Sequence, residues 1–114
     1  MKFEKKHFGD TVNILANDHY VAMPLKIDTS ETDGIMKAGT PVAANGKKAK
    51  TTSSGEPAVQ SSDAVGVLLH DVTGDNPNGT VVIHGFIDTA KAQTYSGVTV
   101  DAATKAALPM IRFM

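Results

Sequence analysis

The chain of 114 residues has no cysteine and no tryptophan, and only 5% of its residues are aromatic. The absence of cysteine excludes disulfide bonds, a thiol nucleophile and a thiolate metal site. With few aromatic side chains, the core must be built mainly from Val, Ile, Leu and Ala, and alanine contributes little apolar area. We therefore expect one domain with a thin core, for which burial in an oligomer is a common source of extra stability.

An excess of charge of one sign and long apolar runs are also missing. Eleven basic and twelve acidic residues give a formal net charge of -1, whereas nucleic-acid-binding proteins usually carry a clear basic excess. The apolar runs are much too short to span a bilayer, and the charged N-terminal stretch lacks the apolar run of a signal peptide. We expect synthesis in the cytoplasm, with no direct binding to nucleic acid or to a membrane.

The most strongly patterned stretch lies in the second half of the chain and predicts an antiparallel hairpin. Its strands are the apolar β-type runs Val65–Leu69 and Thr80–Ile83, which flank a cluster of turn residues. Pro77-Asn78 in this cluster predicts the tight turn, because proline presets φ and asparagine tolerates left-handed backbone angles. Gly66 and Gly85 interrupt the strands and predict a bulge or a close backbone approach.

The other patterned segments predict short β units and one helix. Asn45-Gly46 is typical of a hairpin turn, and residues 51–57 are a loop by composition. Asp101–Leu108 predicts a helix that Pro109 ends, and Met110–Met114 predicts a last strand paired into the sheet. The expected fold is mainly β: a small single-domain β barrel or sandwich-like fold with one short C-terminal helix.

The first 30 residues differ from the rest, because they are polar and follow no sustained period. We therefore divide the chain into an extended N-terminal arm, residues 1–30, and a β-rich domain, residues 31–114. Phe3 and Phe8 are isolated apolar anchors within the arm, and Pro24 suits an edge strand or a bend. A polar, aperiodic arm seldom becomes ordered without a surface to lie on, so we expect the arm to bind a partner.

Histidines and carboxylates near the hairpin are the main candidates for chemistry. With a turn at Pro77-Asn78, His84 would lie across the strands from Asp71, with His70 one step away. A metal site would need a third convergent ligand, and none is evident, so no metal and no cofactor are predicted. Nucleophile-elbow and Walker patterns are absent, so no catalytic residue is predicted. A small β-rich hydrolase or sugar-binding module that uses His70, Asp71 and His84 remains an alternative.

Three segments resemble, in their order and spacing, the tailed-bacteriophage head decoration proteins of the lambda type. They are Lys37–Gly46, Ala64–Leu69 and Thr80–Ile87, and an alanine-rich helix and an apolar last strand follow them, as in that family. The resemblance covers the chain from about Ile35 onward. It implies a non-enzymatic virion protein that binds the outer surface of the expanded head as homotrimers at three-fold and quasi-three-fold positions. There it would hold subunits of the major capsid protein together against the pressure of the internal DNA.

The resemblance further implies that the N-terminal arm lies on the capsid and can add a strand to it. Strand addition needs little sequence pattern because backbone groups supply the hydrogen bonds, and the lysines add an electrostatic share that salt would screen. The expected capsid contacts are Phe3, Lys5, Lys6, Phe8, Val12 and Ile14. Another phage structural subunit, such as a tail or fibre accessory, remains an alternative of the same class.

Overall fold

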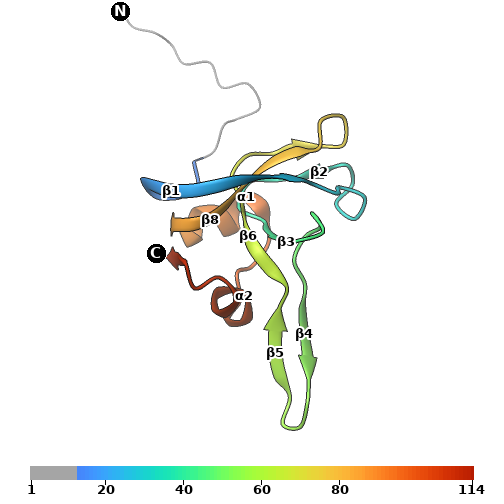
Figure 1. The fold of residues 1–114 in the computed structure, drawn as a ribbon, viewed down its shortest axis with the longest axis vertical. Coiled ribbons are helices and arrows are strands. Elements are labelled where there is room, and N and C mark those ends of the chain that lie inside the picture. The colour runs from blue at the N-terminus through green and yellow to red at the C-terminus, as the bar shows by residue number, and fades with distance from the viewer. Residues whose placement is uncertain (1–12) are drawn as a thin grey trace, which may run out of the picture.

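The computed structural model describes residues 13–114, and Figure 1 shows the arrangement of its elements. The predicted mainly β class is confirmed, although the chain forms two helices where the sequence predicts one. In chain order the elements are β1 (Leu15–Lys26), β2 (Ile35–Met36), β3 (Pro41–Ala43), β4 (Thr51–Ser54), β5 (Val59–Ser62), β6 (Ala64–Leu68), β7 (Val72–Thr73), β8 (Asn78–Ile87), α1 (Thr89–Ser96), α2 (Ala102–Ala107) and β9 (Ile111–Phe113).

The main sheet has five strands, and β8 lies at its centre. The strand order is β1-β8-β6-β3, all antiparallel, and β9 adds to the C-terminal part of β8 as its one parallel neighbour. The strands β2 and β7 form a small second sheet, and β4 and β5 form a third. The predicted barrel is wrong in one respect, because the sheet does not close. Its outermost strands, β1 and β3, do not pair with each other, and closure requires that pairing.

The predicted central hairpin is confirmed, but its turn lies earlier than expected. Val67 pairs with Val82 and Leu68 with Val81. The tight turn is at residues 73–76, where the Asn76 N–H donates to the Thr73 carbonyl over 3.1 Å. Pro77 instead accepts a hydrogen bond from the Ile27 N–H, 2.7 Å away, so it extends the pairing of the strand ends.

The boundary expected at residue 30 does not separate an arm from the domain in the described residues. Ile14 is fully buried, and its carbonyl accepts a hydrogen bond from the Asp88 N–H over 2.7 Å. From Leu15 to Lys26 the chain pairs with β8, apart from irregularities around residues 16–19 and at Val21-Ala22. Residues 14–26 therefore belong to the sheet of the domain, with Pro24 on an edge strand as the sequence suggests.

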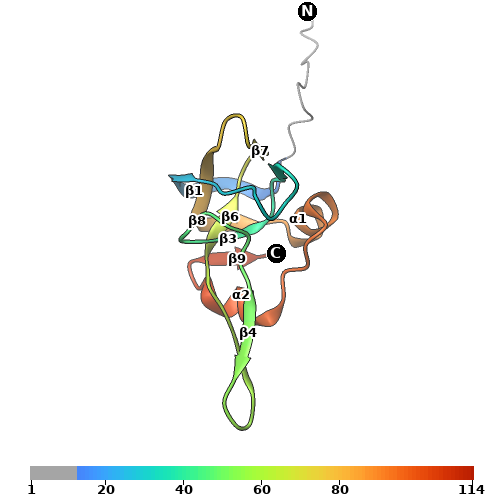
Figure 2. The same cartoon turned by 90° about the vertical axis from the view of Figure 1, so that its right-hand side faces the viewer.

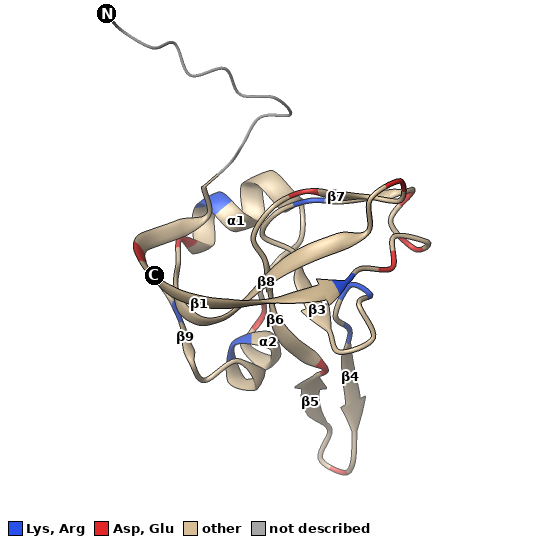
Figure 3. Cartoon of the chain, turned by 45° about the horizontal axis from the view of Figure 1, so that its top comes forward, with Lys and Arg blue, Asp and Glu red and all other residues tan. Residues whose placement is uncertain are grey.

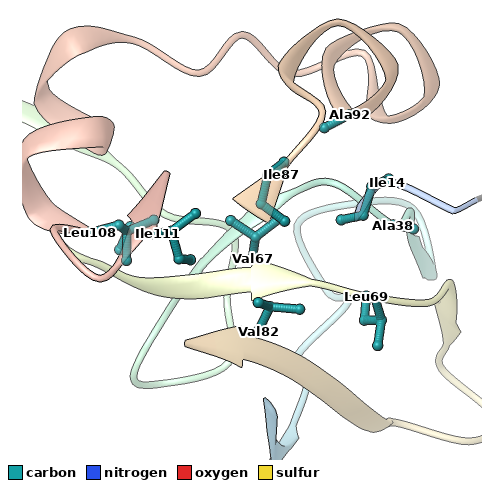
Figure 4. Packing of buried hydrophobic residues seen from close by; sticks show 10 residues of the cluster. Ile14, Ala38, Val67, Leu69, Val82, Ile87, Ala92, Leu108 and Ile111 are labelled. Carbon is teal, nitrogen blue, oxygen red and sulfur yellow. The ribbon is translucent and has the colours of Figure 1, made fainter. Parts of the chain in front are cut away.

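Side chains alternate between the two faces of the sheet and form two buried clusters. Neighbours such as Val67 and Leu68, or Val82 and Val81, belong to different clusters, as the pleat of a strand requires. The larger cluster includes side chains from α1 and from Leu108, which follows α2 (Figure 4). Its buried members are Ile14, Ala38, Ala64, Val67, Leu69, Val82, Ile87, Ala92, Leu108 and Ile111. The cluster on the opposite face contains Ile27, Met36, Val42, Leu68, Val72 and Val81.

The C-terminal helix and the last strand are confirmed. The Asp101 carboxylate caps α2 by accepting from the Thr104 N–H over 2.8 Å, and β9 joins the sheet within the segment predicted for it. The helix α1 was not predicted. Asp88 caps its start by accepting from the Lys91 N–H, and Gly97 ends it in the left-handed conformation. None of the helices in residues 13–114 has the length and apolar character needed to cross a membrane.

The prediction of a plain loop at residues 51–57 is wrong. Thr51–Ser54 and Val59–Ser62 pair in register as the hairpin β4–β5, which projects from the rest of the domain in both Figure 1 and Figure 2. The chain turns between the strands around Gly55, which has a φ of +89°. Polar Thr and Ser side chains fit a ribbon that is exposed on both faces, so the segment has the composition of a loop.

Candidate interaction surface

The three residues of the possible catalytic or sugar-binding site do not converge. The register of β6 and β8 places His84 opposite the position of Val65, and Asp71 lies six residues further along the chain. At about 3.3 Å per residue in extended backbone, that separation is roughly 20 Å. The expected cross-strand contact depended on a turn at Pro77-Asn78, so it is lost with the earlier turn.

Asp71 instead joins two parts of the fold. One oxygen of its carboxylate accepts from the N–H of the buried Ala38 over 2.9 Å, and the other accepts from the Tyr95 hydroxyl of α1 over 2.6 Å. The Lys37 ammonium lies 5.2 Å from the centre of the Tyr95 ring. The helix also packs closely on Gly39, where an added Cβ would lie 2.8 Å from the Ala92 carbonyl oxygen. Asp71 therefore fastens α1 to the loops beside it.

His84 lies among ring side chains of β1 and β8. Its ring centre is 5.6 Å from that of His19 in an edge-to-face arrangement, and the ring of Phe86 is 6.4 Å from His19. Residues 13–114 contain no group of three or more His, Asp or Glu side chains placed to hold a metal ion. The described residues thus bring two histidines together across the strands, but not the set that the sequence suggested.

Most of the residues expected to contact a capsid cannot be placed. Phe3, Lys5, Lys6, Phe8 and Val12 lie outside the described residues. Ile14 is described, and it is fully buried in the larger cluster, so its side chain is not available at the surface. An interaction surface within the domain must therefore be sought among other residues.

An apolar depression lies on the side of the sheet opposite the larger cluster. It has a volume of about 300 Å³ and is lined by Met23, Leu25, Ala44, Val65 and Val81. Met23 and Val65 are 45% and 41% exposed, whereas Val81 is buried and forms the floor. Large aliphatic side chains that are gathered at one place and half exposed are typical of an interaction site rather than of scattered surface residues.

A β-bulge brings Val65 into this depression. Along β3, Val42 pairs with Gly66 and Ala43 with Ala64, so Val65 is the extra residue of the pair of strands. Gly66 allows the bulge, because an added Cβ would lie 2.3 Å from Cγ1 of Val81 and 2.6 Å from the Val82 oxygen. The bulge and the close approach predicted at Gly66 are both confirmed.

The outer edge of β1 borders the same surface. No strand within residues 13–114 pairs with this edge. The Ile27 N–H points toward β8, and donors alternate sides along a strand, so position 24 faces outward. Proline has no N–H to offer there, so Pro24 removes a donor from the open edge and makes uncontrolled strand pairing less favourable.

The projecting hairpin is fixed to the domain at its base. The Lys50 N–H donates to the Asp63 carboxylate over 2.7 Å, and the Asp63 N–H donates to the Lys50 carbonyl over 3.2 Å. The Thr51 hydroxyl donates to the Asp101 carboxylate over 3.0 Å. Hydrogen bonds from Thr104 and Thr51 lower the pKa of the Asp101 carboxyl below its usual value, and the Thr104 backbone N–H makes the largest contribution. The base is thus held at two carboxylates, and residues 51–61 are exposed.

A second polar cluster joins the Asn45-Gly46 turn to the loop after β1. The Lys47 ammonium lies 4.0 Å from Asp28 and 3.6 Å from Glu31, and the Lys50 ammonium lies 3.5 Å from Glu31. These ion pairs are exposed and each contributes little to stability. The hairpin turn predicted at Asn45-Gly46 is confirmed, since the Gly46 N–H donates to the Ala43 carbonyl over 2.9 Å.

Comparison with known proteins identifies no family for this chain: no family model, no curated protein and no solved structure matches it.

Proposed function

We propose that this chain is a non-enzymatic decoration protein of a tailed-phage head. It binds the outer surface of the expanded capsid as trimers at three-fold and quasi-three-fold positions. There it holds neighbouring subunits of the major capsid protein together against the pressure of the packaged DNA. The virion surface is then its place of action, after synthesis in the cytoplasm of the host.

The observation that carries the proposal is where the family-like segments lie in space. Lys37–Gly46 contains β3, Ala64–Leu69 contains β6, and Thr80–Ile87 lies in β8. These three strands are consecutive neighbours in one sheet, in the order β8-β6-β3. Strands that follow one another in a chain are often neighbours in a sheet, and here the three segments form one continuous unit, as the resemblance implies.

The surface of the domain supports binding rather than catalysis. Asp71 is engaged in holding α1, and His84 is remote from it, so the hydrolase or sugar-binding alternative gains no support from the geometry. Exposed aliphatic side chains are instead gathered around Met23 and Val65, beside the open edge of β1. An apolar patch beside an unpaired strand is suited to contact with another protein.

Stabilisation of the capsid would follow from many weak contacts. A protein that binds only the expanded lattice stabilises that lattice by mass action. If the three arms of a trimer bind together, linkage can raise the overall affinity by roughly 10²- to 10⁴-fold over one arm. Each arm can therefore bind weakly while the trimer holds several capsid subunits in place.

The test uses particles that lack this protein. Bare and re-decorated particles are heated or treated with a divalent-ion chelator, and DNA release is followed with a fluorescent dye. Decorated particles should keep their DNA to higher temperature, and electron microscopy should show the protein clustered at three-fold positions. Equal heat resistance would contradict the stabilising role and favour a display or host-surface role, and density on the tail would favour a tail or fibre accessory.

A variant that lacks residues 2–10 tests the role of the arm. It should fail to bind particles, while its thermal unfolding stays close to that of the full chain, because the proposal makes this segment a contact with the capsid and not a part of the core. If the deletion unfolded the domain, the segment would be part of the core, and the arm would not be an independent contact.

A further inference from the structure

The imidazole rings of His19 and His84 lie side by side across the pair of strands β1 and β8. In this pair Tyr20 is opposite Gly85, and Val21 is opposite His84. Because side chains alternate along a strand, His19 falls on the same face as His84, as its diagonal neighbour. Gly85 allows the strands to lie close here, since an added Cβ would be 2.9 Å from the Tyr20 Cβ and 3.1 Å from the His19 carbonyl oxygen. The backbone therefore sets the separation of the two rings.

A β-bulge in β8 precedes His84. The residues that pair with Val21 and Ala22 are two apart in β8, which leaves Ile83 as the extra residue. Bulges redirect neighbouring side chains and are common beside functional sites. His84 is half-buried, whereas His19 is exposed. One ring of the pair is thus held by its surroundings, and the other is free to adjust to a ligand.

The distance between the rings fits two imidazoles that bind one tetrahedral metal ion. Zinc–nitrogen bonds are about 2.0–2.1 Å long, and at the tetrahedral angle they place the centres of two bound rings roughly 5.2 Å apart. Bonds at a right angle would place the ring centres roughly 4.5 Å apart. The ring centres of His19 and His84 are 5.6 Å apart, so the spacing favours the tetrahedral ion. Rotation about the side-chain bonds of the exposed His19 can close the remaining difference.

The charges near the pair allow a cation to bind. The strand β8 contains no charged residue, so its whole length is tan in Figure 3. Asp18 precedes His19 in β1 and adds a negative charge. Arg112 of β9 pairs with Phe86, on the side of β8 away from β1. Within residues 13–114 no third histidine or carboxylate converges on the pair, so water or a ligand from a partner would complete the coordination.

We propose that His19 and His84 bind a zinc ion that bridges β1 and β8. Each imidazole donates the lone pair of one ring nitrogen, and the ion joins an edge strand to the central strand of the sheet. Imidazole is a good ligand for zinc, whereas Mg²⁺ and Ca²⁺ prefer oxygen ligands. The site lies within one chain, so its occupation does not depend on capsid decoration.

Calorimetric titration of the full chain, made without a histidine tag, tests the site. The wild type should bind one zinc ion. His19→Ala and His84→Ala should each weaken binding by about tenfold or more, because a single imidazole loses the gain from two linked ligands. The chain has four histidines, so His7→Ala and His70→Ala are matched controls that should bind zinc as the wild type does. Mg²⁺ at the same concentration should not compete.

Thermal unfolding gives a second readout, because an ion that bridges two strands binds only the folded chain. Zinc at about a hundred times its dissociation constant should raise the melting temperature of the wild type by up to roughly 10 °C. It should have much less effect on His19→Ala, whose exposed position keeps the variant folded. A wild type that binds no zinc up to about 1 mM, or binding that depends on His7 or His70 and not on the pair, would overturn the proposal. Capsid decoration is measured separately, so its failure and the failure of the zinc site are distinguishable.

Discussion

Replacing Asp71 with alanine should destabilise the domain, and the size of the effect separates a structural role from a catalytic one. The substitution leaves the N–H of Ala38, a residue only 1% exposed, without its acceptor. A buried donor that loses its partner costs about 1–3 kcal/mol. The bond from the Tyr95 hydroxyl is exposed, so we assign it about 1 kcal/mol. The free energy of unfolding should therefore fall by about 2–4 kcal/mol.

Urea or thermal unfolding followed by circular dichroism measures this change. The melting temperature should fall by roughly 8–16 °C, since a domain of this size loses about 4 °C per kcal/mol. All variants are compared at one protein concentration, because self-association would raise the apparent stability. Asp71→Asn keeps an acceptor for the Ala38 N–H and should lose much less. His70→Ala is an exposed control, expected to stay within about 0.5 kcal/mol. If Asp71→Ala were as stable as the wild type, Asp71 would not hold α1 to the loops beside it.

Two further substitutions test other parts of the fold. The pKa of Asp101 is lowered in the folded state, so its carboxylate stabilises the fold fully above the unfolded value of about 3.9. This stability is lost as the pH falls through the lower folded pKa. The melting temperature of Asp101→Asn should therefore change less with pH than that of the wild type below about pH 4. The same change with pH in both proteins would contradict this. Gly66→Ala should cost about 1–3 kcal/mol or more because its Cβ would clash with Val81 and Val82. Gly74→Ala is the matched control, because its added Cβ would lie 3.4 Å from the nearest atom. Equal melting temperatures of the two variants would show that the close packing at Gly66 does not require glycine.

The apolar patterns of the sequence predicted the centre of the fold. Gly66–Leu69 and Val81-Val82 are buried, and the apolar composition of the two runs is enough to indicate paired strands. The turn between them was misplaced because the linking segment holds two turn signals, Gly74-Asp75 and Pro77-Asn78. Which of the two signals forms the turn depends on long-range contacts. These are the pairing of β7 with β2 and the hydrogen bond from the Ile27 N–H to the Pro77 carbonyl.

Elements without an apolar period were missed. Ala92 is the one fully buried side chain of α1, and Tyr95 only partly packs on the core, so the sequence of the helix shows no amphipathic pattern. The caps were the available signal: Asp88 at the start and Gly97 at the end. The hairpin β4–β5 offered only a glycine-proline turn between polar runs.

The candidate surface could not have been found from the sequence. Its residues come from β1, β6, β8 and the turn after β3, and their meeting depends on the sheet order. Val65 reaches the depression only because a bulge interrupts the alternation of β6. The sequence indicated a bulge near Gly66, but it gave no indication of which neighbouring side chain would change faces.

The central position of β8 constrains the order in which the protein can be assembled during synthesis. Its partners β1 and β9 come from opposite ends of the described chain, so neither pairing is a local event. At about 5–20 residues per second, β1 leaves the ribosome roughly 3–12 s before β8 is complete. Val21 and Met23, which are half exposed even in the folded domain, are then fully accessible to other nascent chains. Pro24 is thus placed in the strand that waits longest for its partner, where a missing donor disfavours premature pairing.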